Sequence, residues 1–224
     1  MRPGSEVSVT ELAAWVSSRV PTTHRYVLGI AGPPAAGKST LSQHLAAAIN
    51  REHAIAAEIA PMDGFHKTSA ELDAVGARHR KGQPDTFDVS GFVARLKLLR
   101  EAPLGEPVPW PIYDRELHDP VPDKIAFSAQ RLAVVEGNYL LLDQPGWAEV
   151  RSQLDEVWFL DADGSIIEQR LTDRHLLGGK TAEQAKAKIA DSDMPNAHLI
   201  VGTRGRADVV LSETSGNYFV SEVR

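Results

Sequence analysis

The stretch GIAGPPAAGKST, residues 29–40, constrains the fold of this chain more than any other segment. It contains Gly32, four further residues, and then Gly37-Lys38-Ser39, which is the spacing of a phosphate-binding loop. Such a loop joins a buried strand to a helix, and its backbone N–H groups surround the β- and γ-phosphates of a nucleotide. We therefore expect the nucleotide to contact Gly32, Pro33, Pro34, Ala35, Ala36, Gly37, Lys38, Ser39 and Thr40.

The residue types in this loop suit different tasks. Glycine at both ends permits the backbone angles and the close approach to phosphate that the loop needs. Lys38 brings a positive charge to the β- and γ-phosphate oxygens, and the hydroxyl of Ser39 is expected to ligate Mg²⁺. Thr40 is the natural next contact, with the α-phosphate. The loop therefore predicts a nucleotide and Mg²⁺ as the bound groups.

Apolar and amphipathic segments alternate along the rest of the chain. This alternation predicts the α/β class and the P-loop NTPase fold, with a mainly parallel central sheet and helices on both faces. Residues 103–130 are rich in proline, and we expect a short extended segment at 108–113 there. We expect strands at 25–32, 54–60, 132–135, 156–161 and a closing strand at 207–212, and helices at 8–20, 38–50, 89–101, 165–177, 181–191 and 196–202.

Length and charge limit the class of protein. The chain has 224 residues, of which 42% are hydrophobic, so we expect one domain over 1–224, with an N-terminal helix in about 1–24 and a lid in about 165–192. The net charge of -6 argues against a general nucleic-acid binder. No apolar run is long enough to span a bilayer, so a cytoplasmic location is the default expectation. Because dimers are the commonest oligomers, a homodimer is expected on prior grounds.

A phosphate-binding loop serves switches, motors and kinases alike. A guanine-nucleotide switch needs an Asn-Lys-x-Asp element to recognise the base, and the chain has none, which makes ATP the expected nucleotide. The segment VWFLD resembles the apolar strand that ends in aspartate in ATP-driven motors, but VVEG offers a competing carboxylate and no coupling domain is evident. A small-molecule kinase needs a base, an acceptor pocket and cations that cover the transferred phosphoryl group, usually on a mobile lid.

Two carboxylates follow strands of the expected sheet. Asp63 comes directly after the strand at 54–60, at the sheet edge where ligands bind in parallel sheets. It is the candidate base, with a capping or turn aspartate as the alternative. Glu136 ends the strand beside the phosphate loop. It is expected either to ligate Mg²⁺ directly or to hydrogen-bond to a ligand of Mg²⁺. Its alternative is a turn carboxylate.

The cations for a lid lie on the helix after Asp161. Arg170 and Arg174 are four residues apart and therefore share one helix face, from which two guanidinium groups can reach one phosphate. The alternative is a solvated basic face that pairs with Glu168 and Asp173.

These segments together resemble the superfamily of phosphate-loop kinases that contains uridine kinase, phosphoribulokinase and type I pantothenate kinase. The matching pieces are GPPAAGKST, PMDGFH, PDTFDV, PIYDRELHD, VVEGNYLLL and RLTDRH, in the family's order, over residues 25–212. The chain is most similar to a bacterial subgroup that is labelled as sugar or fructose-transport kinases. MDGFH favours the pantothenate kinases and PDTFD the uridine kinases, so the acceptor stays open among a nucleoside, a sugar and a pantothenate-like alcohol.

The resemblance implies a role for each matching position. It makes Asp63 the catalytic aspartate, Glu136 the acidic residue near Mg²⁺, and Arg170 and Arg174 the lid arginines. The expected catalytic set is Asp63, Lys38, Arg170 and Arg174, and the expected metal ligands are Ser39 and Glu136. The residues that it implies for the acceptor pocket, besides Asp63, are His66, Asp85, Tyr113, Arg115 and His118. The expected reaction is phosphoryl transfer from ATP to a hydroxyl of a small molecule. The alternative from another class is a regulatory or binding module that hydrolyses ATP slowly and has no small-molecule acceptor.

Overall fold

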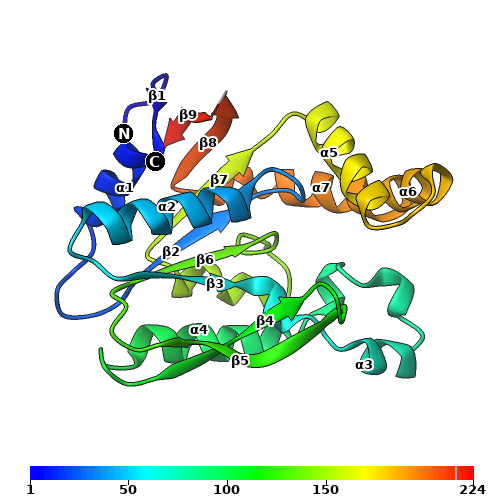
Figure 1. The fold of residues 1–224 in the computed structure, drawn as a ribbon, viewed down its shortest axis with the longest axis horizontal. Coiled ribbons are helices and arrows are strands. Elements are labelled where there is room, and N and C mark those ends of the chain that lie inside the picture. The colour runs from blue at the N-terminus through cyan, green and yellow to red at the C-terminus, as the bar shows by residue number, and fades with distance from the viewer. Residues whose placement is uncertain (215) are drawn as a thin grey trace.

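The computed structural model describes residues 1–214 and 216–224. Within them the central sheet has seven strands in the order β1-β9-β8-β7-β2-β6-β3 (Figure 1). Five of these strands run parallel to one another, as predicted, and β9 and β1 are added in antiparallel pairs. The strands are β1 Glu6–Val7, β2 Tyr26–Ala31, β3 Ala57–Pro61, β6 Leu132–Gly137, β7 Glu156–Asp161, β8 Val209–Thr214 and β9 Asn217–Val223.

Helices cover both faces of this sheet, as the alternating pattern predicts (Figure 1). Leu28 and Ile30 of β2 pack in the cluster that includes α1 and α2, whereas Val27 and Ala31 pack in the cluster that includes α4. This is the period of two that places successive side chains on opposite faces of a strand. The helices are α1 Val9–Ser17, α2 Lys38–Glu52, α3 Ser69–Ala74, α4 Val89–Glu101, α5 Gly164–Leu177, α6 Ala182–Lys188 and α7 Met194–Val201.

The expectation that the sheet closes at 207–212 is wrong. The segment forms β8, but the chain returns as β9, which pairs with β8 and in turn with β1. Tyr218 and Val220 of β9 are buried while Phe219 between them is exposed. This antiparallel extension lies at the edge of the sheet opposite β3.

The proline-rich segment forms a two-stranded hairpin of β4 Val108–Asp114 and β5 Asp119–Phe127 beside β3 (Figure 1). Each strand of a two-stranded sheet has a free edge, which tolerates prolines that cannot donate a ladder hydrogen bond. The buried Trp110 anchors the hairpin, because its Nε1 donates to the carbonyl of Pro61 at 3.0 Å. The hairpin therefore extends along the site end of β3.

Helices α5 and α6 form a lobe with the first half of α7, drawn in yellow and orange in Figure 1, whereas Ile200 near the end of α7 packs in the main core. Between α6 and α7 the chain forms a π-helix at Ile189–Asp193. Ile167, Leu171, Ile189 and Ala197 make a small apolar cluster of their own there. None of the helices in the described ranges is long and apolar enough to cross a membrane.

Candidate active site

The phosphate loop lies at the carboxyl ends of the parallel strands. It follows β2 and leads into α2, as the motif predicts, and it borders a cavity of about 660 Å³. The loop packs closely on β7, because a Cβ at Gly32 would lie 2.4 Å from the carbonyl oxygen of Leu160. Gly37, the residue just before α2, has a φ of 100° and lies in the left-handed conformation that favours glycine. Loop residues from Pro34 to Thr40 line the cavity.

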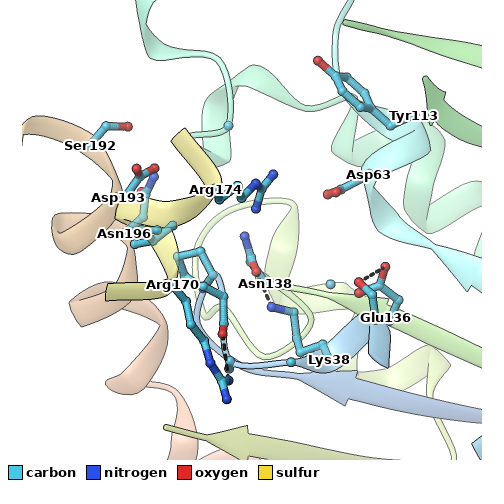
Figure 2. Close-up of a pocket in the computed structure, with 18 of the residues that line it drawn as sticks. Lys38, Asp63, Tyr113, Glu136, Asn138, Arg170, Arg174, Ser192, Asp193 and Asn196 are labelled. Atoms are coloured by element: carbon cyan, nitrogen blue, oxygen red, sulfur yellow. Dashed lines mark hydrogen bonds between the residues drawn. The ribbon is translucent and has the colours of Figure 1, made fainter. Parts of the chain in front are cut away.

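Lys38 is buried at the base of this cavity, with 7% of its surface exposed. Its Nζ donates to the carbonyl of Pro33 at 2.9 Å and to Oδ1 of Asn138 at 2.7 Å (Figure 2). Burial lowers the pKa of Lys38 to about 8, although the charges of Glu136 and Asp63 oppose that shift. An anion that enters the cavity should therefore stabilise the charged form of Lys38.

Glu136 is the second-last residue of β6 and pairs with Ile30 of β2 and Pro61 of β3. The hydroxyl of Ser39 donates to its Oε1 at 3.3 Å. Burial, followed by the negative charge of Asp63, raises the pKa of Glu136, whereas Lys38 and Ser39 oppose the rise. A carboxylate beside a hydroxyl is a donor set that suits a hard cation.

A metal held here would need further ligands. The described residues hold no group of three or more His, Cys, Asp or Glu that could bind a metal ion by itself. Mg²⁺ is usually bound through one or two protein groups together with phosphate oxygens and water. Ser39 and Glu136 therefore fit a magnesium ion that arrives with a nucleotide.

Asp63 lies on the 3-10 turn Met62–Phe65 that follows β3. Its charge acts on the pKa of Lys38, Glu136 and Tyr113, so it lies among the groups of the cavity (Figure 2). Its carboxylate accepts no hydrogen bond from the described part of the chain, unlike a capping or turn aspartate. The neighbouring Gly64 is needed for close packing, because a Cβ there would lie 2.2 Å from the carbonyl oxygen of Pro111.

Aromatic rings border the cavity next to Asp63. The ring of His66 lies between Phe87, at 4.0 Å, and Tyr113, at 4.7 Å between centroids. Burial lowers the pKa of His66, although the charge of Asp63 opposes this. Tyr113 donates its hydroxyl to the carbonyl of His118 at 2.8 Å, and Lys81 lies 5.3 Å above its ring. These rings offer a flat apolar wall beside a free carboxylate.

Arg115 follows Tyr113 on the hairpin and lines the same cavity. A smaller cavity of about 340 Å³ continues from Asp63 and Glu136 beneath the hairpin, and Arg115 borders it as well.

The lobe of α5, α6 and α7, which contains the segment predicted to be a lid, lines the opposite side of the cavity. Arg170 donates to Oε2 of Glu213 at 2.7 Å and to the carbonyl of Ala35 at 3.3 Å. It thus spans from α5 to β8 and the phosphate loop, and pairs with neither Glu168 nor Asp173 in the described structure. Figure 2 shows Arg174 pointing into the space between Asn138 and Asp63, where its charge helps to lower the pKa of Lys38.

Two residues assigned to the acceptor pocket do not line the cavity. Asp85 forms an ion pair with Arg80 at 2.7 Å, and the side chain of His118 is exposed on the turn of the hairpin. His118 contributes its carbonyl oxygen, which holds Tyr113 and Lys81. Both segments lie beside the pocket, but these side chains point elsewhere.

The structure also shows contacts for Asn138 and Lys81, to which no role was assigned from the sequence, and for His175, which the sequence places on the same helix as Arg170 and Arg174. Asn138, two positions after Glu136, contacts Lys38 from the end of β6. Lys81 lines the cavity and pairs with Asp119 at 2.7 Å. On the lid, His175 bonds to Asp193 at 2.6 Å. The position of Asn138 at a strand end was the available sequence signal for it.

Comparison with known proteins places this site in a family. The sequence pattern of the Phosphoribulokinase / Uridine kinase family matches residues 27–218. The chain belongs to this family. It is 37% identical to "Uncharacterized protein YggC" of Escherichia coli, over 87% of this chain and 81% of that one. It is 31% identical to the "Pantothenate kinase" of Limosilactobacillus reuteri, over 86% of this chain and 70% of that one.

Solved structures agree with the fold. The chain of a "putative fructose transport system kinase" from Silicibacter sp. TM1040 is 33% identical, with a TM-score of 0.84 over 92% of this chain and 99% of that one. The phosphoribulokinase of Rhodobacter spheroides shares the fold, with a TM-score of 0.60 at 13% identity, over 84% of this chain and 70% of that one. The resemblance inferred from the motifs and the P-loop kinase fold are thereby confirmed.

Proposed function

We propose that this protein is an ATP-dependent small-molecule kinase that transfers the γ-phosphoryl group of ATP to a hydroxyl of an acceptor. The observation that carries the proposal is the free carboxylate of Asp63, which shares one cavity with the phosphate loop and with Arg174 of the lid. A switch or a motor does not need such a carboxylate beside an aromatic wall. The kinase names among the relatives support the same reaction class.

In this proposal the acceptor oxygen attacks the γ-phosphorus and the bond from that phosphorus to the β–γ bridging oxygen breaks. ADP leaves, and the hydroxyl proton passes to Asp63. Lys38 and the guanidinium groups of Arg170 and Arg174 stabilise the negative charge on the phosphoryl oxygens. Ser39 and Glu136 would hold Mg²⁺, which neutralises charge on the β- and γ-phosphates. The remaining contribution is positioning of the two reactants.

The acceptor is proposed to be a nucleoside, a sugar or a pantothenate-like alcohol. His66, Tyr113 and Arg115 surround Asp63 on the hairpin side, where an apolar face and hydroxyl groups of an acceptor fit. Asp85 and His118 are left out of this proposal, because neither side chain lines the cavity. A homodimer and a cytoplasmic location remain predictions.

The first experiment measures ADP release from ATP with a panel of uridine, cytidine, pantothenate, ribulose phosphate, fructose and other sugars. We expect one class of acceptor to increase the rate. Slow hydrolysis that no small molecule changes, but that a protein partner stimulates, would instead identify a regulatory module.

The second experiment replaces the proposed base. Asp63→Asn should lower turnover at least about 10²-fold, the range for loss of a general base. ATP affinity should stay near normal, because the carboxylate faces the acceptor. Unchanged turnover with the correct acceptor would remove Asp63 from this role.

A further inference from the structure

Asn138 occupies a constrained position at the end of β6. It follows Gly137, where a Cβ would lie 2.6 Å from Cβ of Met62, so the chain passes closely against the turn that carries Asp63. The side chain lies in the cavity beside Lys38, as Figure 2 shows. The reaction proposed above gives this residue no role.

The contact with Lys38 fixes the orientation of the Asn138 amide. A lysine ammonium group has donors and no acceptor, so the atom that it meets at 2.7 Å must be the amide oxygen. The Nδ2 group therefore faces away from Lys38. In Figure 2 it points toward the guanidinium group of Arg174, on the side of the cavity where Asp63 lies. Two N–H donors are thus aimed at this space, and no described residue accepts a hydrogen bond from them.

We propose that Asn138 is a catalytic residue whose Nδ2 donates a hydrogen bond to an oxygen of the transferring phosphoryl group. The inference rests on the proposed function, because that group would lie between Lys38, Arg174 and Asp63. Charge spreads over the three equatorial oxygens during transfer, and donors that are already oriented stabilise it without reorganisation. Because the amide is uncharged, it stabilises this charge without repelling the cationic groups of Lys38 and Arg174.

The test separates this role from that of a residue that holds Lys38 in place. Asn138→Asp keeps an oxygen that accepts from Lys38 but removes the Nδ2 donors. Asn138→Ala removes both. The probe is MgADP with aluminium fluoride, which mimics the transferring phosphoryl group, and the readout is its affinity relative to that of MgADP alone. Thermal unfolding of both variants checks that they fold, and Asn138→Asp carries the test alone if Asn138→Ala does not.

We expect this affinity ratio to fall at least about tenfold in both variants, with the affinity for MgADP near normal, and kcat to fall about 10²-fold once an acceptor is known. Rescue of the ratio in Asn138→Asp would overturn the proposal and leave Asn138 a positioning residue for Lys38. An unchanged ratio in both variants, or an equal loss for MgADP, would overturn it as well.

A charge control and the acceptor panel complete the design. Asn196→Asp adds a carboxylate to the lid wall of the same cavity, and a fall in the ratio as large as that of Asn138→Asp would overturn the proposal. The mimic needs no acceptor. A lowered ratio combined with a negative acceptor panel therefore refutes only transfer to a small molecule, whereas a positive panel with an unchanged ratio refutes only the role of Asn138.

Discussion

At the scale of single residues, the burial of Lys38 couples nucleotide binding to protons. Its pKa is lowered to about 8, mainly by burial, so the free protein loses this proton at mildly alkaline pH. Phosphate favours the charged lysine and should raise its pKa again. On MgATP binding, Lys38 should therefore take up a proton at about pH 9. At about pH 7 it should take up none, because it is already charged. Above about pH 8 the affinity should fall by up to about tenfold per pH unit.

Calorimetry of MgATP binding in two buffers of different ionisation enthalpy measures this uptake. Lys38→Met is the matched control, because this variant should bind MgATP more weakly and take up no proton at alkaline pH. If the wild-type protein takes up no proton at about pH 9, the buried lysine is not the group that titrates.

At the scale of elements, the fold is held by a buried guanidinium group that has no acidic partner among the described residues. Arg25, which precedes β2 and is fully buried, donates to the carbonyls of Leu99, Ser128 and Gln130 at 2.6, 3.0 and 2.9 Å. It thus joins β2 to the end of α4 and to the segment before β6. Burial lowers its pKa, but an arginine stays charged.

Arg25→Met should destabilise the protein by about 2–4 kcal/mol, because it leaves three carbonyl groups without their donor. Arg25→Lys should restore only part of this loss, since one ammonium cannot reach three carbonyls in the geometry of the fork. Urea unfolding gives the free energy for each variant. The exposed Arg2→Met is a control that should change it by less than about 0.5 kcal/mol. Equal stability of Arg25→Met and the wild type would show that these carbonyls find other donors.

The elements also show what the sequence could predict. The segments around the phosphate loop carry complete local signals, so β2, α2 and α4 were predicted nearly to the residue. The hairpin was predicted only at 108–113, because prolines at alternate positions hide its period. The π-helix at Ile189–Asp193 has no local signature.

Some residues of the site could be predicted from the sequence and others could not. Asp63 and Glu136 were predictable, because the carboxyl ends of neighbouring parallel strands meet at one edge. The contact of Asn138 with Lys38 and that of Lys81 with Asp119 depend on how distant segments pack. Asp85 and His118 lie in the right segments, but the direction of a loop side chain does not follow from a motif.

At the scale of the whole molecule, the main cavity has an excess of positive charge on an acidic chain. The net charge is -6, whereas six cationic and four acidic side chains line the main cavity. Such a cavity attracts anions locally while the rest of the surface repels them. The cations come from the phosphate loop, the hairpin side and the lid: Lys38, Lys81, Arg115, Arg170, Arg174 and Lys188.

Arg170 joins the lobe of α5, α6 and α7 to β8 and to the phosphate loop. Arg170 pairs with Glu213 at 2.7 Å, and both side chains are more than one-third exposed. Such a pair is worth about 0.2–1 kcal/mol. The proposed function places Arg170 on the phosphates of the nucleotide, a contact that competes with Glu213, so Glu213→Gln should raise the affinity for MgATP by up to about fivefold. High salt should reduce this gain, because salt screens exposed pairs.

Glu168→Gln is the matched control for this prediction. It removes the same charge from the helix that carries Arg170, yet no described contact joins the two side chains. Titration of MgATP into both variants at low and high salt separates a specific release of Arg170 from a general change of charge. Equal gains in the two variants would mean that net charge alone sets the affinity. A gain confined to Glu213→Gln would mean that this ion pair holds the lid back from the nucleotide.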